Sequence, residues 1–158
     1  MNLDFERKEE INYSIIIPHK NSTVLLERCL KSIPCRKDVQ VIVVDDNSEN
    51  QEELNAVVGG FSQVELILTQ GGGAGHARNE GLKYIRGKWV LFADADDFYN
   101  KNAFSILDNY INSDNDVIYF FANSLDVNTL LPTPREKDLQ NIYPQIRNRP
   151  HKMTQRSK

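Results

Sequence analysis

Three carboxylates follow one short apolar run, and their spacing is the most informative chemical feature of the sequence. Asp94, Asp96 and Asp97 come directly after Val90-Leu91-Phe92-Ala93. Carboxylates this close repel one another and lose solvation on burial, so a fold rarely gathers them without a counter-charge. Hard oxygen ligands suit Mg²⁺ or Mn²⁺. The pattern favours binding of a divalent cation or a ribose by Asp94 and Asp96, with Asp97 capping the segment that follows.

Three further groups of polar or glycine residues also follow predicted strands. They are Pro18-His19-Lys20-Asn21, Asp45-Asp46-Asn47-Ser48 and Gly71–Gly75. The strands predicted before the four groups are Tyr13–Ile17, Val39–Val44, Val64–Leu68 and Trp89–Ala93. Pro18 is expected to end the first of them. In an open parallel α/β sheet, ligands bind outside the carboxyl ends of the strands. We therefore expect the four groups to converge on one site.

Two of these groups leave alternatives open. One of Asp45 and Asp46 could cap the next helix, while the other accepts hydrogen bonds from a base or a ribose. Gly71–Gly75 could be a simple turn, but glycines ahead of a helix also let backbone N–H groups approach an anion. Arg78, in the first turn of that helix, could reach a diphosphate. The glycine spacing matches neither a dinucleotide fingerprint nor a P-loop.

The elements that would position these residues alternate along the chain. Helices are predicted at Thr23–Ile33, with Ser22 or Thr23 as cap, and at Glu52–Val58, His76–Ile85 and Ala103–Ile111; Asp116–Phe121 is a predicted fifth strand. Most of the strands are continuous apolar runs, which is typical of strands buried on both faces. The order therefore predicts an α/β fold, an open and mostly parallel sheet with helices on both faces.

Length, charge and composition narrow the function classes. A chain of 158 residues suits one domain with a real core. The formal charge of -3 argues against nucleic acid or an anionic membrane as the main partner. No apolar run approaches the ~20 residues that cross a bilayer, and Met1–Asn12 lacks the apolar region of a signal peptide. Cys29 and Cys35 match neither a metal site nor a disulfide framework, so we expect a cytoplasmic protein.

Four motifs resemble, in order and spacing, those of the family 2 glycosyltransferases of the GT-A fold. They are Ser14-Ile-Ile-Ile-Pro18-His-Lys-Asn21, Val43-Val-Asp45-Asp46-Asn-Ser48, Gly75-His-Ala-Arg78-Asn79-Glu-Gly81-Leu82 and Phe92-Ala-Asp94-Ala-Asp96-Asp97. The resemblance covers residues 13–121. It implies a Rossmann-like sheet of GT-A type and transfer of a sugar from a nucleotide diphosphate sugar to an acceptor hydroxyl, usually with inversion and with Mn²⁺ or Mg²⁺.

The resemblance also implies roles for single residues. Those expected to border the donor are Pro18, His19, Asn21, Asp45, Asp46, Gly73, Arg78 and Asp94. Pro18 and its neighbours border the nucleoside, and one of Asp45 and Asp46 contacts the base. Asp96 corresponds to the metal-binding acid of the Asp-x-Asp motif, and Asp94 contacts the ribose or the metal, which neutralises charge on the leaving group.

The chain departs from the family pattern after Phe121. A family member normally continues with an acceptor-binding half that supplies a carboxylate as general base. Nothing after Phe121 resembles that half, so we nominate no catalytic base. We expect the donor-binding half of a longer enzyme, so that the fold is truncated; the alternative is a nucleotide-sugar-binding module without turnover. A receiver-type phosphotransfer protein is disfavoured because the third strand ends in Thr69-Gln70 instead of a phospho-acceptor Asp.

Three segments are expected: a polar extension at 1–12, the nucleotide-sugar-binding domain at 13–121, and a basic tail or start of a missing acceptor region at 122–158. Residues 135–158 hold seven Lys or Arg against two Asp or Glu, a net charge of +5. Such a segment is either loosely ordered or a basic patch for the inner face of a membrane or an anionic acceptor. The acceptor itself, a sugar, polysaccharide or lipid-linked molecule, is not identified.

Overall fold

The computed structural model describes residues 10–118, and the compact unit that carries the sheet ends at Asp114. Its strands are β1 (Tyr13–His19), β2 (Val39–Asp45), β3 (Val64–Leu68) and β4 (Trp89–Phe92). Its helices are α1 (Thr23–Ser32), α2 (Gln51–Gly59), α3 (Gly73–Gly81) and α4 (Ala103–Leu107), and short 3₁₀ turns at Leu82–Tyr84 and Asp108–Tyr110 extend the last two. The strands pair in parallel in the order β3-β2-β1-β4, which confirms the predicted fold class.

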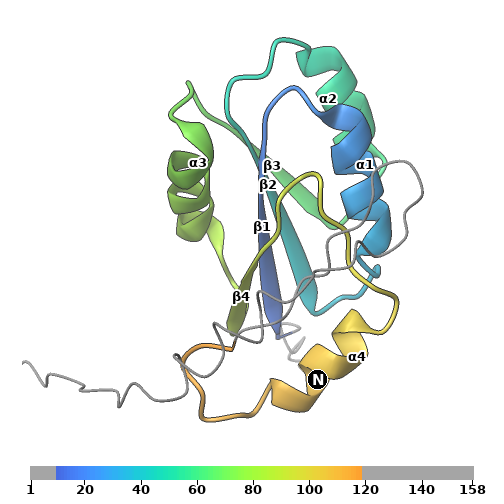
Figure 1. Ribbon diagram of the computed structural model, residues 1–158, viewed down its shortest axis with the longest axis vertical. Coiled ribbons are helices and arrows are strands. Elements are labelled where there is room, and N and C mark those ends of the chain that lie inside the picture. The colour runs from blue at the N-terminus through green and yellow to red at the C-terminus, as the bar shows by residue number, and fades with distance from the viewer. Residues whose placement is uncertain (1–9, 119–158) are drawn as a thin grey trace, which may run out of the picture. The chain divides into compact units, whose positions relative to one another are not determined.

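Helices cover both faces of the sheet, and alternate residues of each strand supply the two cores. Figure 1 shows α3 on one face and α1 and α2 on the other. On β1, Ile15 and Ile17 pack into the larger cluster with Leu26 of α1. Ile16, between them, packs on the opposite face with Ala77 of α3. Burial on both faces explains why the strands read as unbroken apolar runs.

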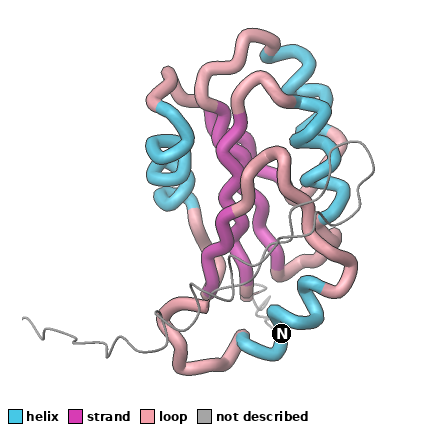
Figure 2. Tube along the Cα trace, viewed as in Figure 1, coloured by secondary structure: helices cyan, strands magenta, loops and turns pink. Residues whose placement is uncertain are grey.

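The loops that follow the four strands lie at one edge of the sheet. Because the strands are parallel, their carboxyl ends meet at this edge, which is uppermost in Figures 1 and 2. The predicted polar groups are therefore brought together, as the order of elements led us to expect. In the described part of the chain, no helix is long and apolar enough to cross a membrane.

The first strand does not end at Pro18 as predicted; it continues to His19, and Pro18 pairs in register with Val44. Successive residues of a strand turn their backbone groups to alternate sides. The His19 carbonyl accepts from Asp46 on the β2 side, so the position of Pro18 faces β4. The pairing of β4 with β1 stops at Phe92, opposite Ile16. Beside Pro18 there is therefore no paired β4 residue that would need a hydrogen bond from the N–H that proline lacks.

Other boundaries also differ from prediction. α3 begins at Gly73 instead of His76, because positive φ values at Gly71, Gly72 and Gly73 turn the chain straight from β3 into the helix. The predicted helix Ala103–Ile111 is an α-helix only to Leu107. Of the predicted strand Asp116–Phe121, residues 116–118 form no strand and the remainder lies outside the described residues.

A cluster around Arg36 closes the opposite edge of the sheet. Its guanidinium bonds Asp38 at 2.7 Å and Asp108 at 2.9 Å, and its Cζ lies 5.8 Å from the centroid of the Tyr13 ring and 5.7 Å from that of Phe104. Hydrogen bonds from Arg36, aided by one from the side chain of Asn12, hold the pKa of Asp38 at about 2 despite partial burial. The cluster fastens α4 beneath the strands.

Candidate functional site

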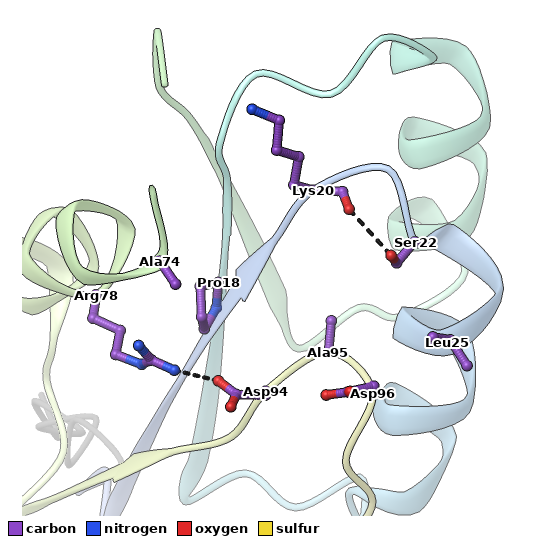
Figure 3. Close-up of a pocket in the computed structure, with 9 residues that line it drawn as sticks. All are labelled: Pro18, Lys20, Ser22, Leu25, Ala74, Arg78, Asp94, Ala95 and Asp96. Atoms are coloured by element: carbon purple, nitrogen blue, oxygen red, sulfur yellow. Dashed lines mark hydrogen bonds and ion pairs between the residues drawn. The ribbon is translucent and has the colours of Figure 1, made fainter. Parts of the chain in front are cut away.

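A cavity of about 300 Å³ opens at the carboxyl edge of the sheet, between β1, the start of α3 and the loop after β4. Its lining residues, shown in Figure 3, are Pro18, Lys20, Ser22, Leu25, Ala74, Arg78, Asp94, Ala95 and Asp96. Of the residues predicted to form the site, the structure brings Pro18, Arg78, Asp94 and Asp96 together here. The cavity thus combines the carboxylates of Asp94 and Asp96 with the guanidinium of Arg78, whereas the Lys20 side chain points away from these groups (Figure 3).

The three acids after β4 divide into two groups. The Asp97 carboxylate accepts from the backbone N–H of Asp94 at 3.2 Å, and the Asp97 N–H donates to the Asp94 carbonyl at 2.9 Å. Asp97 therefore closes the turn of its own loop instead of facing the cavity. The Asp94 carboxylate forms an ion pair with Arg78, and both Asp94 and Asp96 line the cavity (Figure 3).

Asp94 and Asp96 supply carboxylate oxygens, the type of donor that a hard divalent cation takes. Within residues 10–118, no group of three or more His, Cys, Asp or Glu side chains could hold a metal ion. Mg²⁺ is usually bound by one or two carboxylates and takes its other ligands from water and substrate phosphates. Two exposed carboxylates on one cavity wall fit that requirement, with Arg78 as the present counter-charge of Asp94.

Asp45 is buried and uses its acceptor capacity inside the protein. Its carboxylate accepts from His19 Nδ1 at 2.9 Å, from Gln51 Nε2 at 2.8 Å, and from both the backbone N–H and the hydroxyl of Ser48. Burial opposes ionisation, but these hydrogen bonds together outweigh it and lower the pKa of Asp45. Neither acid of the pair caps α2, because the cap is Asn50, which accepts from the Glu53 N–H.

His19 and Asn21 belong to the same polar network and do not line the cavity. His19 Nε2 accepts from the Ser22 N–H at 3.1 Å, so Nδ1 carries the proton that it donates to Asp45. Asn21 donates its backbone N–H to the Ser48 hydroxyl and accepts from the Glu49 N–H, both at 2.8 Å. The network ties the loop after β1 to the loop after β2.

Asp46 joins the end of β2 to the start of α3. Both of its oxygens accept from the Gly73 N–H, at 3.1 and 3.0 Å, and Lys20 Nζ lies 3.8 Å from it. The N–H of Gly73, expected to approach an anionic ligand, is therefore bonded to an anion of the protein itself. Ser22 occupies the N-cap position of α1, as predicted, but its hydroxyl donates to the Lys20 carbonyl and makes no side-chain cap bond to the helix.

Sequence reasoning did not single out several lining residues. Lys20 lay inside a recognised motif, and Ala74 lay inside the glycine group, so position alone could have nominated both. Leu25 comes from the first turn of α1 and carries no signal of its own. It reaches the cavity only because α1 packs beside the loop after β4.

Comparison with known proteins decides the family. The model of the family described as "Glycosyl transferase family 2" matches residues 14–157, most of the chain. The chain belongs to glycosyl transferase family 2. It is thus a glycosyltransferase family 2 domain, as the motifs had indicated, and the predicted family and transferase class are confirmed.

Two of the relatives are named as poly(ribitol-phosphate) glycosyltransferases. A poly(ribitol-phosphate) beta-glucosyltransferase of Bacillus spizizenii is 34% identical over 98 residues, which are 57% of this chain and 16% of the relative. The poly(ribitol-phosphate) beta-N-acetylglucosaminyltransferase TarS of Staphylococcus aureus (strain Mu50) is 38% identical over 106 residues, 59% of this chain and 18% of TarS. The chain therefore spans less than one fifth of either relative.

A solved structure supports the fold assignment independently. The crystal structure of S. aureus TarS residues 1–349 superposes with a TM-score of 0.57 at 28% identity, and the match covers 64% of this chain and 32% of that one. The open parallel sheet is accordingly that of a GT-A, Rossmann-like domain. Two further relatives are named for minor teichoic acid biosynthesis and for amylovoran biosynthesis.

Proposed function

We propose that the chain is the donor-binding portion of a glycosyltransferase, which binds a nucleotide diphosphate sugar with Mn²⁺ or Mg²⁺ and transfers the sugar to an acceptor hydroxyl with inversion. One observation carries the proposal: Asp94, Asp96 and Arg78 line a single cavity at the carboxyl edge of a parallel sheet. Paired carboxylates and an arginine there suit a cation and the diphosphate it binds.

Under this proposal, the charged residues of the cavity, Pro18 and the neighbouring Asp46 have separate roles. Asp94 and Asp96 would hold the cation, which when bound supplies charge neutralisation at the diphosphate leaving group. Arg78 and Lys20 would add positive charge for the phosphates, and Pro18 would border the nucleoside. Asp45 has its four hydrogen bonds already, so Asp46 is favoured as the acid that contacts the base.

The acceptor belongs to the same proposal. Two of the relatives are named for transfer to poly(ribitol phosphate), so we propose a hydroxyl of a polysaccharide or polyol-phosphate chain, free or lipid-linked, as acceptor. We further propose that the protein works in the cytoplasm, with the basic residues 135–158 contacting the inner face of the membrane. Fractionation of cells expressing the chain, with and without residues 135–158, tests that contact: an unchanged membrane share argues against it.

Binding of donor sugars by calorimetry tests the central claim. UDP-, GDP- and dTDP-linked sugars are titrated into the full chain with Mn²⁺ and with excess chelator. We expect one nucleotide class to bind only with Mn²⁺, and Asp96→Asn and Asp94→Asn to weaken it by more than about 10-fold. Glu27→Gln, which removes a half-exposed acid on α1 paired with Lys31, is the control and leaves binding unchanged. Metal-independent binding, or none, contradicts the proposal.

A binding module without turnover is the second candidate. The described cavity contains two acids, Asp94 and Asp96, and both are assigned to the cation. A general base for the acceptor hydroxyl is not among the lining residues. Release of nucleoside diphosphate from the donor that binds, measured with and without added polyol-phosphate chains, separates the two candidates, because the module binds the donor and releases nothing.

A further inference from the structure

One face of α1 holds the acidic loop that follows β4. Two side chains of the helix bond main-chain groups of the loop. Arg28 Nη2 donates to the backbone carbonyl of Asp96 at 2.5 Å. One turn further along the helix, the Ser32 hydroxyl accepts from the backbone N–H of Tyr99 at 2.9 Å. Residues four apart lie on the same face of a helix. Arg28 and Ser32 therefore fasten two main-chain groups of the loop, three residues apart.

Arg28 is itself held in place by more than one contact. Its guanidinium carbon lies 5.4 Å from the centroid of the Phe98 ring, within the range of a cation–π interaction. Its Nε is buried without a hydrogen-bond partner among the described residues, so the group accepts a desolvation cost to reach this position. A surface arginine with no structural task would turn its Nε to solvent.

Arg28 and Arg78 bond different kinds of atom in the acidic loop. Arg78 pairs with the carboxylate of Asp94 and would compete with a cation for those oxygens. Arg28 bonds the carbonyl of Asp96 and leaves the Asp96 carboxylate facing the cavity. The positive charge also offsets repulsion among three neighbouring acids while no cation is bound. Arg28 can thus order the loop without occupying its ligands.

We infer that Arg28 is a positioning residue, which presents the Asp94 and Asp96 carboxylates to a divalent cation by fixing the backbone of their loop. The inference rests on the proposed function, because it assumes that these two acids bind the cation. Arg28 would contact neither the cation nor the donor. Its effect passes through the Asp96 carbonyl.

The direction in which Mn²⁺ affinity changes when Arg28 is replaced distinguishes positioning of the ligands from electrostatic repulsion of the cation. Arg28→Met keeps the aliphatic stem and removes both the charge and the donor groups. If the charge of Arg28 only repelled a cation, its removal would tighten Mn²⁺ binding. If Arg28 positions the ligands, its removal weakens Mn²⁺ binding although a repulsive charge has gone.

The experiment measures binding of Mn²⁺ alone to the full chain, with free Mn²⁺ followed by electron paramagnetic resonance. We expect Arg28→Met to weaken binding by about 10-fold, the effect typical of losing an outer partner of metal ligands. Arg36→Met is the matched control. Arg36 also forms an ion pair and lies over an aromatic ring, but at the opposite edge of the sheet. This variant lowers the melting temperature and leaves Mn²⁺ affinity unchanged. Equal or tighter binding by Arg28→Met overturns the inference.

Amide hydrogen exchange in metal-free protein gives a second readout. The N–H groups of Asp97 and Tyr99, bonded within the loop and to Ser32, should exchange faster in Arg28→Met than in wild type or Arg36→Met. Unchanged exchange there also overturns the inference. If the wild-type chain binds no Mn²⁺ in the absence of donor, the exchange result decides whether Arg28 orders the loop, and the titration of donor sugars with Mn²⁺ decides the proposed function separately.

Discussion

Gly81 sets how closely α3 approaches the sheet, and a methyl group there should push the two apart. A Cβ at Gly81 would lie 2.6 Å from Ile16 Cγ2 and 3.2 Å from Val44 Cγ2. Both side chains are fully buried in the core on this face, so neither has room to yield. Because Arg78 lies three residues earlier on the same helix, the contact at Gly81 also determines where that guanidinium meets the cavity.

The magnitude of Gly81→Ala follows from two opposing effects. Overpacking a well-packed core costs about 1–3 kcal/mol. Alanine is a better helix former than glycine by up to about 1 kcal/mol, which offsets part of that cost. We therefore expect a net loss of about 1–2 kcal/mol in the free energy of unfolding. Gly75→Ala lies in the same helix with nothing within 4 Å of its Cβ, and should gain about 0.5–1 kcal/mol.

Urea unfolding of the two variants and the wild type measures the difference. Gly81→Ala should lower the midpoint and Gly75→Ala should raise it, with the dependence on urea concentration unchanged in both. Donor binding by Gly81→Ala should weaken as well, since Arg78 moves with α3. If Gly81→Ala proves as stable as Gly75→Ala, the close packing of α3 on β1 is not as described and the reasoning fails.

Two further predictions concern titration and reactivity. Hydrogen bonds from Arg36 hold the pKa of Asp38 at about 2 in the folded protein, below its ordinary value of 3.8. The ionised Asp38 carboxylate therefore stabilises the fold fully above about pH 4, and this stabilisation is lost as the pH falls through about 2. Asp38→Asn should flatten the pH dependence of the urea midpoint between those values, and an unaltered acid limb would contradict this. Burial raises the pKa of Cys29 to about 12, whereas Cys35 is exposed. A thiol reagent at about pH 8 should therefore modify one thiol in the native chain and two after unfolding, and rapid reaction of both in the native protein would refute the burial of Cys29.

The strands were predictable because burial on both faces leaves a clear trace in the sequence. Each predicted strand from Tyr13 to Ala93 corresponds to an observed one within two residues at either end. The extension of β1 through Pro18 was not predictable from its own residues. It depends on where β4 stops pairing, which is a property of a strand more than 70 positions away.

The two acids at the carboxyl end of β2 show the same limit more clearly. Asp45 and Asp46 are adjacent and chemically identical, and the sequence left open which one serves the site. The pleat of the strand turns Asp45 inward, where His19, Ser48 and Gln51 surround it. Asp46 points to the start of α3 instead. Adjacent residues of a strand face opposite sides, so only the packed neighbours on each side separate their roles.

The sequence by itself determined the family, the parallel α/β sheet and the convergence of four loops on one edge, because apolar periodicity and motif order are local properties that any parallel arrangement must respect. Tertiary structure alone decided which side chains reach the cavity: Asp94, Asp96 and Arg78 do, while His19, Asn21 and Asp45 hold the loops together. It also revealed Arg28, whose bond to the Asp96 carbonyl joins residues 68 positions apart. Such contacts depend on distances between elements, and no spacing within a single segment encodes those distances.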